Sequence, residues 1–366
     1  MWILWIEGLL GLLYLLMLML LLRGWKRWPQ NVPKSKLPQP PLSVIIAARN
    51  EAKNLRTFLP SICEQQYERF EVVLVLDRCE DNSLEVAEFL QKTYSNLRYI
   101  QIEELPDNWS GKKFALQRGI QSSKFDHLVF TDADCRAVSG WLDELGSTFA
   151  FGSEIILGLG MYRKGKGWLN RFIRFETWYA GLQYIGWAGW NLPYMAVGRN
   201  LAYKKSVYQE HAGFEAFKES LSGDDDLFVN QYGRLHRLGV VTNTRSRTYS
   251  EAKRSFKEWV SQKSRHLSAS HAYSWGSRMR LGLFHFSHQW HYLIAIGCML
   301  MGIGGWLPLS LLLGRIVISW LLLFRHICQF GHKDLAYTYL ALDLFFFLYN
   351  LFIVPFGLIK KPSWTK

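Results

Sequence analysis

The first part of the chain is an apolar run that leaves few structural options open. Residues Trp2 to Leu22 contain one charged side chain, that of Glu7. A run of about 20 apolar residues is long enough to cross the hydrocarbon core of a bilayer, where a helix satisfies its own backbone groups. No basic segment precedes the run and no small-residue cleavage site follows it, which argues against a secretory signal. We therefore predict that residues 1–23 form an uncleaved transmembrane anchor.

The segment after this anchor is basic and contains several prolines. Its cationic side chains, with no acidic residue among them, are Arg23, Lys26, Arg27, Lys34 and Lys36. Positive charge beside a span marks the cytoplasmic side of the membrane. We therefore expect residues 24–41 to be a linker and the domain that follows it to be cytoplasmic, with the N-terminus outside.

The C-terminal part of the chain is also apolar. Residues 292–324 contain one charge, Arg315, and are interrupted at Gly304–Pro308, so we predict a helical hairpin or a re-entrant pair. A further apolar stretch, residues 335–359, contains Asp343. The predicted boundaries are 251–284 for interfacial amphipathic helices, 285–359 for two or three transmembrane segments, and 360–366 for a basic tail.

The formal net charge of +13 allows either nucleic acid or a membrane surface as a partner. The basic residues gather beside the predicted spans; those before the C-terminal spans are Arg245, Arg247, Lys253, Arg254, Lys257, Lys263 and Arg265. This placement favours anionic lipid headgroups over nucleic acid. The five cysteines show no zinc-site spacing, and we assign them no role.

Residues 42–250 are predicted to form one α/β domain. The predicted strands are Leu42–Ala48, Val72–Leu76, Leu97–Ile102, His127–Thr131 and Glu154–Leu159. The predicted helices are Glu51–Gln65, a helix capped at Asp81–Ser83 that ends near Tyr94, Lys112–Gln121 and Gly140–Phe149. Such alternation is typical of a Rossmann-like, mostly parallel sheet with helices on both faces. Ligands bind beyond the carboxyl ends of the strands in such sheets.

Carboxylates follow these strands at the expected positions. Asp77 follows the second strand, and Asp132 and Asp134 follow the fourth. Two such carboxylates suit a hard divalent cation, Mg²⁺ or Mn²⁺, that bridges phosphates; a turn with two solvated aspartates is the alternative. The run Asp224–Asp226 must be compensated by a cation, a basic partner or water, unless it simply starts a helix.

Taken in order, these motifs resemble the membrane-bound family 2 glycosyltransferases with a GT-A fold, of the ceramide glucosyltransferase-like type. The motifs are Ala48–Glu51, Asp77, Gly111–Lys112, Thr131–Asp134, Gly198–Ala202, Gly223–Asp226 and Gln262 with Arg265. The resemblance covers roughly residues 40 to 270. Order and spacing together carry it, because each motif alone is common.

The resemblance implies a role for each matching residue. Asp132 and Asp134 would hold the metal, with Asp134 the more direct ligand, and Lys112 would face the diphosphate. Asp225 would be the catalytic base, with Asp224 as the alternative in an ambiguous register. The nucleotide-sugar site would also include Arg49, Asn50, Glu51, Asp77, Gln262 and Arg265.

One departure from the family pattern concerns the acceptor. The family motif Gln-x-x-Arg-Trp has His266 in place of its tryptophan, which removes an aromatic wall. The aromatic stretch Trp168–Met195 includes Trp187 and Trp190 and predicts either a lipid entry surface at the bilayer interface or an aromatic core.

Farther on, His285, His288 and His291 share one helix face, which allows a metal site; titratable histidines beside a span are the alternative.

The function implied is that of an inverting transferase. It would move a sugar from a nucleotide-diphosphate sugar, a UDP-hexose in our expectation, to the hydroxyl of a membrane lipid, in a bacterial inner membrane. A transferase acting on a polyprenyl phosphate and a non-enzymatic nucleotide-binding membrane scaffold are the alternatives. Gln262 and Arg265 disfavour the first, and the complete set of carboxylates disfavours the second.

Overall fold

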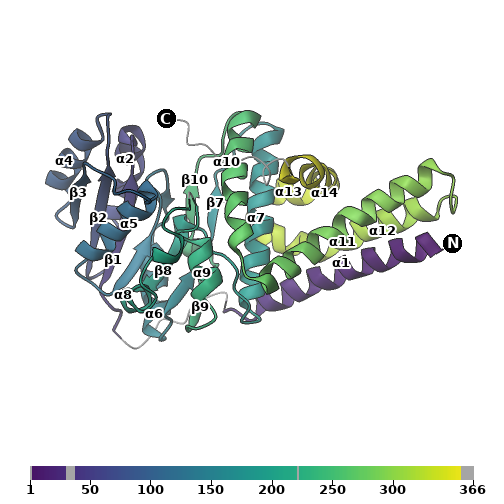
Figure 1. Cartoon of the computed structure of the whole chain (residues 1–366), viewed down its shortest axis with the longest axis horizontal. Coiled ribbons are helices and arrows are strands. Elements are labelled where there is room, and N and C mark those ends of the chain that lie inside the picture. Colours follow the sequence, from purple (N-terminus) through teal and green to yellow (C-terminus); the bar gives the residue numbers. More distant parts are fainter. Residues whose placement is uncertain (1, 30–37, 221, 356–366) are drawn as a thin grey trace. The chain divides into compact units, whose positions relative to one another are not determined.

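The computed structural model describes residues 2–29, 38–220 and 222–355 (Figure 1). The chain divides into two compact units. The helical unit comprises Met1–Arg27, Lys164–Trp190 and Lys253–Lys366, and the α/β unit comprises Trp28–Arg163 and Asn191–Ala252. The predicted basic tail, 360–366, and part of the predicted linker lie outside the described residues. Each unit is a composite of separate chain segments, so its fold depends on contacts between residues distant in sequence.

The α/β unit is built on a seven-stranded sheet within the described residues. In spatial order its strands are β3 (Leu97–Ile102), β2 (Phe70–Asp77), β1 (Leu42–Ala48), β4 (His127–Phe130), β8 (Leu201–Lys204), β6 (Ile155–Leu157) and β9 (Leu238–Val240). Of these, β8 runs antiparallel to both its neighbours, while the other pairings are parallel. The prediction of a mixed, mostly parallel sheet of the GT-A type is confirmed.

The strand register brings several loops to one edge of this sheet. Ile45 of β1 lies opposite Phe130, the last residue of β4. Phe130 in turn lies opposite Leu201, the first residue of the reversed strand β8. The segments that follow β1, β2 and β4 therefore share an edge with the segment that precedes β8. This shared edge is where the rule for parallel sheets places a ligand.

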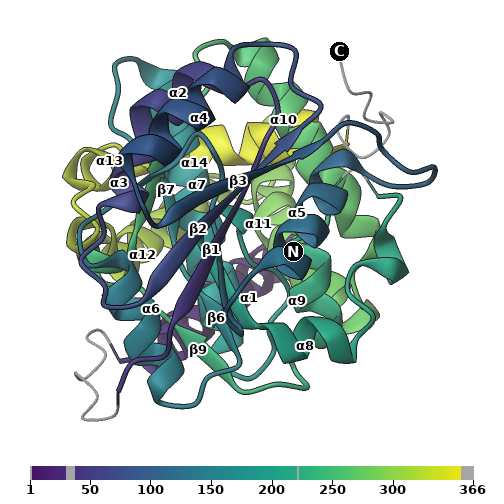
Figure 2. The ribbon, with the colours of Figure 1, turned by 90° about the vertical axis from the view of Figure 1, so that its left-hand side faces the viewer.

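Helices cover both faces of the sheet because the side chains of its strands alternate (Figure 2). On one face, Val44 and Ile46 of β1 belong to a buried cluster that α2 (Ala52–Phe58), α4 (Ser83–Thr93) and α6 (Trp141–Ala150) complete. On the other face, Val73 and Val75 of β2 pack with Ala115 of α5 (Gly111–Ser122). Burial on both faces explains why the strands are nearly continuous apolar runs.

The predicted helix Glu51–Gln65 is wrong in extent. The structure has two short helices there, α2 and α3 (Pro60–Cys63). Pro60 occupies the first turn of α3, and a proline cannot donate the backbone hydrogen bond that would continue α2. The prediction also omitted β8, β9 and a second sheet of three short strands, β5 (Arg136–Ala137), β10 (Thr248–Ser250) and β7 (Gly160–Tyr162).

The helical unit is organised around its first helix. Its principal helices are α1 (Trp2–Lys26), α7 (Trp168–Ala188), α10 (Phe256–Ala269), α11 (Trp275–Leu300), α12 (Leu307–Gln329), α13 (Lys333–Tyr337) and α14 (Tyr339–Leu348). Helix α1 packs against α7, α11 and α12. The predicted glycine-rich turn separates α11 from α12, and Gly304 and Gly305 in this turn have positive φ angles.

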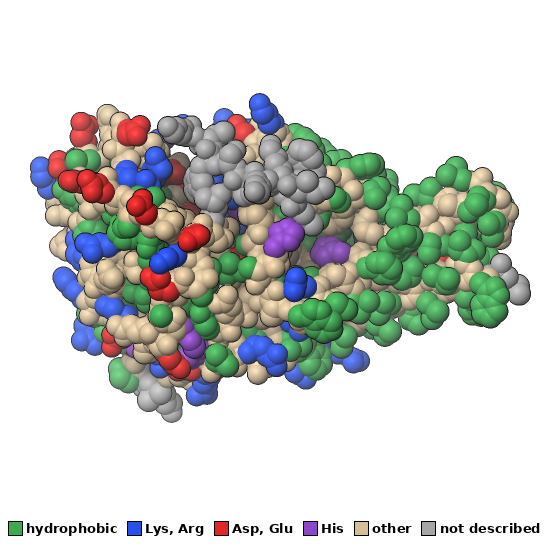
Figure 3. Space-filling model, in the orientation of Figure 1, with side chains coloured by type: hydrophobic (Ala, Val, Ile, Leu, Met, Phe, Trp, Pro, Cys, Tyr) green, Lys and Arg blue, Asp and Glu red, His purple; other side chains and the backbone are tan. Residues whose placement is uncertain are grey.

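Apolar side chains are exposed along this unit. Among the described residues, α1 and α12 are each long and apolar enough to cross a membrane. Exposed side chains include Leu9 and Leu16 on α1, Phe286 on α11, and Val317 and Leu321 on α12. Figure 3 shows hydrophobic side chains gathered over these helices. A continuous apolar surface of this kind is characteristic of contact with lipid or with another protein.

Two of the isolated charges in the apolar segments, Arg315 and Asp343, are paired inside the helical unit. Asp343 accepts a hydrogen bond from Arg315 at 2.7 Å and another from Tyr292 at 2.7 Å, and His288 lies 3.3 Å from the same carboxylate. His291 instead contacts the carbonyl of Glu7 at 2.9 Å. The histidines predicted to share a helix face therefore contact different partners. Within the described residues, they form no three-ligand metal cluster.

The aromatic side chains of α7 are mostly internal. Phe172, Phe175, Trp178 and Tyr179 are buried and make ring contacts within the helical unit. The stretch was predicted to be either a lipid entry surface or an aromatic core, and these four residues form an aromatic core.

Removal of one member of the buried ion pair should destabilise the helical unit. We expect Arg315→Leu to lower the free energy of unfolding by about 3–5 kcal/mol, because it leaves the Asp343 carboxylate buried without its cation. The double variant Arg315→Leu, Asp343→Leu should recover much of that loss. Thermal unfolding of the full chain in detergent, followed by circular dichroism, measures both. A double variant no more stable than the single one would contradict the prediction.

Candidate active site

Two carboxylates follow strand β4 at the shared edge of the sheet. Side-chain ligand atoms of Asp132, Asp134 and Cys135 all lie within 4.8 Å of one another. The Cys135 thiol is buried, and burial together with the two neighbouring carboxylates raises its pKa well above the ordinary value. Hard divalent cations prefer oxygen ligands to the soft sulfur of a cysteine. The effective donors are therefore carboxylate oxygens, which fit Mg²⁺ or Mn²⁺.

Lys112 connects this pair to the acidic run in the sequence. It lies in the first turn of α5, and its Nζ is 3.1 Å from Asp132 Oδ1 and 3.0 Å from Asp224 Oδ2. Burial alone would lower the pKa of Lys112, but the carboxylates of Asp132, Asp224 and Asp225 raise it well above its ordinary value. Lys112 is therefore a fixed positive charge between two groups of acids.

The three consecutive aspartates have different surroundings. Although burial opposes ionisation of Asp224, Lys112 and Lys113 hold its pKa below the ordinary value. The neighbouring Asp225 is different: burial and the charges of Asp224 and Asp226 raise its pKa well above the ordinary value. Asp225 accepts hydrogen bonds from the backbone N–H groups of Gly198 and Asp226, the second at 2.8 Å.

The acids surround one pocket in the α/β unit. The lining residues are Ala47, Lys112, Leu116, Phe130, Thr131, Asp132, Gly198, Leu201, Tyr203, Asp224 and Asp225. Four of the predicted site residues are therefore brought together from three separate chain segments. Asp134 belongs to the adjoining carboxylate pair.

The loops after β1 and β2 are joined beside this edge. Asn50, which has a φ of 56°, accepts a hydrogen bond from the backbone of Glu80 at 2.8 Å, and the N–H of Glu51 donates to Ser83 at 2.9 Å. Asp77 is buried and pairs with Arg78 through both carboxylate oxygens, at 2.8 and 3.1 Å. Arg49 is exposed.

Gly111 is required where α5 begins. A side-chain carbon at this position would lie 2.6 Å from Asp77 Oδ2 and 2.6 Å from Arg78 Nη2. The absence of a side chain therefore lets the start of α5 lie against the Asp77 carboxylate.

Sequence reasoning missed two supporting residues, of which Lys113 is the first. Its side chain is buried, and Nζ donates to the carbonyls of Ser220 and Ser222, the second at 2.8 Å. Burial lowers the pKa of Lys113 to about 8 against the opposing effect of the nearby aspartates. Its spacing to Leu116 and Ile120, which are also buried, places it on the apolar face of α5, and that periodicity was a usable signal.

The second supporting residue is Asn200, which lies in the predicted motif Gly198–Ala202 but was assigned no role of its own. Asn200 is fully buried. Its amide donates to the carbonyls of Leu159 and Ser246, at 2.9 and 2.8 Å, and accepts from the indole of Trp141 at 3.0 Å. These bonds fix the backbone that presents Gly198 to Asp225. No local pattern identifies such a role.

The remaining predicted site residues lie in the helical unit. Gln262 and Arg265 are half-buried on α10, and His266 is exposed. Trp187 is buried, with the Arg280 guanidinium 5.5 Å from its ring centre. Trp190 donates to the carbonyl of Leu20 at 2.9 Å. The roles assigned to these five residues stay predictions.

The fold and the site together define the class of protein. A mostly parallel sheet with one reversed strand, and an Asp-x-Asp pair at its carboxyl edge, is the GT-A arrangement. The structure of the mannosyltransferase PcManGT from Pyrobaculum calidifontis, solved with GDP-Man and Mn²⁺, has the same fold, with a TM-score of 0.60 over 95% of this chain and 99% of that chain. The sequence identity is 16%, so the likeness concerns the fold alone.

Sequence comparison assigns part of the chain to a family. Residues 43–212 match the model of glycosyl transferase family 2, so the chain carries a domain of that family. Glycosyltransferase AglE of Haloferax volcanii is 32% identical over 30% of this chain and 36% of its own length. The 4,4'-diaponeurosporenoate glycosyltransferase of Staphylococcus haemolyticus is 36% identical over 25% of this chain and 24% of its own length. The matches thus span about a third or less of these curated relatives.

Removal of the Lys112 charge should lower the free energy of unfolding by an amount that depends on pH. The pKa of Asp224 is lower in the folded protein than in the unfolded chain, so ionised Asp224 stabilises the fold at any pH above its unfolded pKa. This stabilisation is lost as the pH falls through the folded pKa. We expect Lys112→Met to cost about 1 kcal/mol near neutral pH, since the side chain is partly exposed and screened.

The difference from wild type should shrink in acid. Thermal unfolding across a pH series measures it, and Lys92→Met, at an exposed position of α4, is the matched control. An equal difference at every pH would show that Lys112 acts through packing rather than charge.

Proposed function

We propose that this protein is an inverting family 2 glycosyltransferase that moves a sugar from a nucleotide-diphosphate sugar to a hydroxyl of a membrane lipid. The observation that carries the proposal is the position of Lys112 between Asp132 and Asp224, beside Asp225. The pocket is lined by this cation, by Asp132 as one of the two candidate metal ligands, and by Asp225 as the candidate base, which supports the proposal. Family 2 membership of residues 43–212 supports the same chemistry.

Asp225 is the proposed catalytic base. A base works best when its pKa lies near the working pH, and burial with two like charges raises the pKa of Asp225 from the ordinary carboxyl range. The N–H of Gly198 orients the carboxylate. Asp225 takes the proton of the acceptor hydroxyl as the oxygen attacks the anomeric carbon, and the nucleoside diphosphate leaves from the opposite face.

Asp134 and Asp132 are the proposed metal ligands. When bound there, Mg²⁺ or Mn²⁺ would neutralise charge on the donor's two phosphates. Lys112 adds a second positive charge on the same side of the pocket and stays protonated throughout. Asp77 and the loop of Arg49, Asn50 and Glu51 are proposed to contact the nucleoside, with a UDP-hexose as the expected donor.

The membrane location is part of the proposal. The exposed apolar side chains of α1, α11 and α12 support insertion into a bilayer, with the α/β unit on the cytoplasmic side of a bacterial inner membrane. Basic side chains next to the helices suit anionic headgroups. We assign Gln262 and Arg265 to the donor phosphates, and Trp187, Trp190 and His266 to the acceptor side. The predicted division into anchor, linker, catalytic domain and C-terminal spans is retained as part of this proposal.

Loss of the proposed base should abolish transfer. We expect Asp225→Asn to lower kcat by about 10²–10⁴-fold while donor binding persists, because an amide cannot accept the proton. The assay offers labelled nucleotide-sugars and a panel of lipids to the full chain in detergent. Asp107→Asn, at an exposed position of the same unit, is the matched control.

Asp224→Asn separates the two candidate bases. It should retain transfer and move the acidic limb of the kcat/KM profile to lower pH, because one like charge beside Asp225 is gone. Undiminished turnover by Asp225→Asn would refute its role. Transfer to a polyprenyl phosphate would support the alternative acceptor, and donor binding without any transfer by the wild type would support the scaffold.

Metal dependence gives a separate test. We expect chelation to stop transfer, and Mn²⁺ or Mg²⁺ to restore it, because the two aspartates supply oxygen ligands. Asp134→Asn should raise the metal concentration needed for half-maximal rate by about tenfold or more, since one tenfold step corresponds to about 1.4 kcal/mol of lost binding. Full activity of the wild type in chelator would contradict the assignment.

A further inference from the structure

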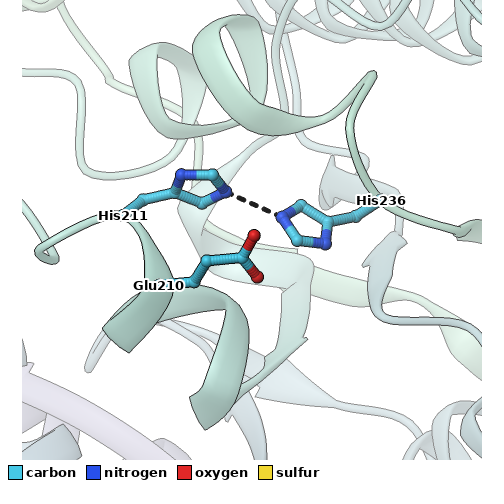
Figure 4. A group of neighbouring side chains, drawn as sticks. All are labelled: Glu210, His211 and His236. Atoms are coloured by element: carbon cyan, nitrogen blue, oxygen red, sulfur yellow. Dashed lines mark hydrogen bonds between the residues drawn. The ribbon is translucent and has the colours of Figure 1, made fainter.

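A second group of metal-binding side chains lies in the α/β unit, apart from the carboxylates already described. It consists of Glu210, His211 and His236, whose ligand atoms all lie within 4.8 Å of one another (Figure 4). Glu210 ends α8 (Lys205–Glu210), His211 follows it, and His236 precedes β9. We call these three residues the histidine cluster.

The histidine cluster and the proposed active site lie at opposite edges of the sheet. Strand β8 is reversed, so its last residue, Lys204, pairs with His127, the first residue of β4. The first residue of β9, Leu238, likewise lies opposite Ile155, the first residue of β6. Both arms of the cluster therefore emerge at the amino edge of the parallel strands. Neither the family match nor the proposed transfer reaction requires a group there.

Both imidazole rings are held in place. The Nε2 atoms of His211 and His236 are 2.8 Å apart, as the dashed line in Figure 4 marks. The His211 ring stacks on Tyr232, with centres 3.9 Å apart and planes 8° from parallel. The His236 side chain is 6% exposed, and its other nitrogen, Nδ1, lies 3.7 Å from Glu154 Oε2.

This arrangement matches the way proteins orient histidine ligands. A metal-binding imidazole usually directs one nitrogen to the ion and the other to a carboxylate or carbonyl. His236 has a carboxylate on that side, Glu154, at 3.7 Å, which is an ion-pair distance rather than a hydrogen bond. Glu154 itself accepts a hydrogen bond from the N–H of Arg237 at 2.9 Å. In the hydrogen-bonded pair, one hydrogen lies between the two facing nitrogens. A cation bound to both nitrogens would replace that hydrogen, and zinc–nitrogen bonds of about 2.0–2.1 Å require the two rings to move slightly apart.

We propose that the histidine cluster binds a divalent transition metal, with Zn²⁺ as the expected ion. Two imidazole nitrogens and one carboxylate form a ligand set that zinc uses, and water completes the coordination. Glu210 is exposed, which leaves the site open to solvent for entry of the ion. The bound ion joins the end of α8 to the segment before β9. It is distinct in chemistry from the oxygen pair of Asp132 and Asp134, which suits harder cations.

Cobalt substitution tests this site directly. The full chain in detergent is stripped with chelator, supplied with excess Mg²⁺ to occupy oxygen sites, and titrated with Co²⁺. We expect visible absorption bands that saturate at one equivalent and disappear when Zn²⁺ is added. His211→Ala and His236→Ala should each abolish the bands, and His271→Ala, at an exposed position outside the cluster, should keep them.

A variant of the supporting carboxylate refines the test. Glu154→Gln should weaken Co²⁺ binding by about 10–100-fold without abolishing it. Circular dichroism establishes that each variant is folded; if His236→Ala is not, His211→Ala decides the outcome. Absence of bands in the wild type, or bands that survive His211→Ala, would overturn the proposal and leave the two histidines as a hydrogen-bonded pair only.

Discussion

The ammonium group of Lys112 is the constraint on which the proposed active site depends. It lies between Asp132 and Asp224, which come from segments far apart in the sequence. Carboxylates gathered at the edge of a sheet repel one another unless a cation lies among them. Because Lys112 pairs with Asp224, that carboxylate stays ionised, and its charge adds to the effect of burial in raising the pKa of Asp225. One ion pair thus gives two adjacent aspartates different chemistry.

The reversed direction of strand β8 places its two flanking segments at opposite edges of the sheet. Since β8 runs against its neighbours, the segment before it carries Gly198 to the carboxyl edge. The segment after it carries His211 to the amino edge. The candidate carboxylate pair that follows β4 and the histidine cluster therefore lie at opposite edges of the sheet in the same unit. Asn200 secures the reversed strand through three buried hydrogen bonds.

The apolar segments of the helical unit contain a few charged side chains. Isolated charges in apolar segments are costly unless they find partners. Arg315 and Asp343 meet in the interior, and Tyr292 and His288 share the same carboxylate. The outward surfaces of α1 and α12 can then remain apolar, which is the property that membrane insertion requires.

Much of the fold and part of the site could be predicted from the sequence alone. The strands β1 to β4 and the acids that follow them were predictable because apolar runs and the residues that end them are local features. The three-residue strands β7 and β10 were not, because their pairing depends on neighbours distant in the sequence. The end of α2 before Pro60 could also have been predicted from the local sequence, because proline interrupts a helix, but it was not predicted.

The different surroundings of Asp224 and Asp225 show what only the tertiary structure decided. The sequence determined that three acids stand together. Which of them pairs with Lys112, and which faces Gly198, depends on how α5, β4 and the segment before β8 meet. Ionisation responds to burial and to charges within a few ångströms, and those are set by packing rather than by order along the chain.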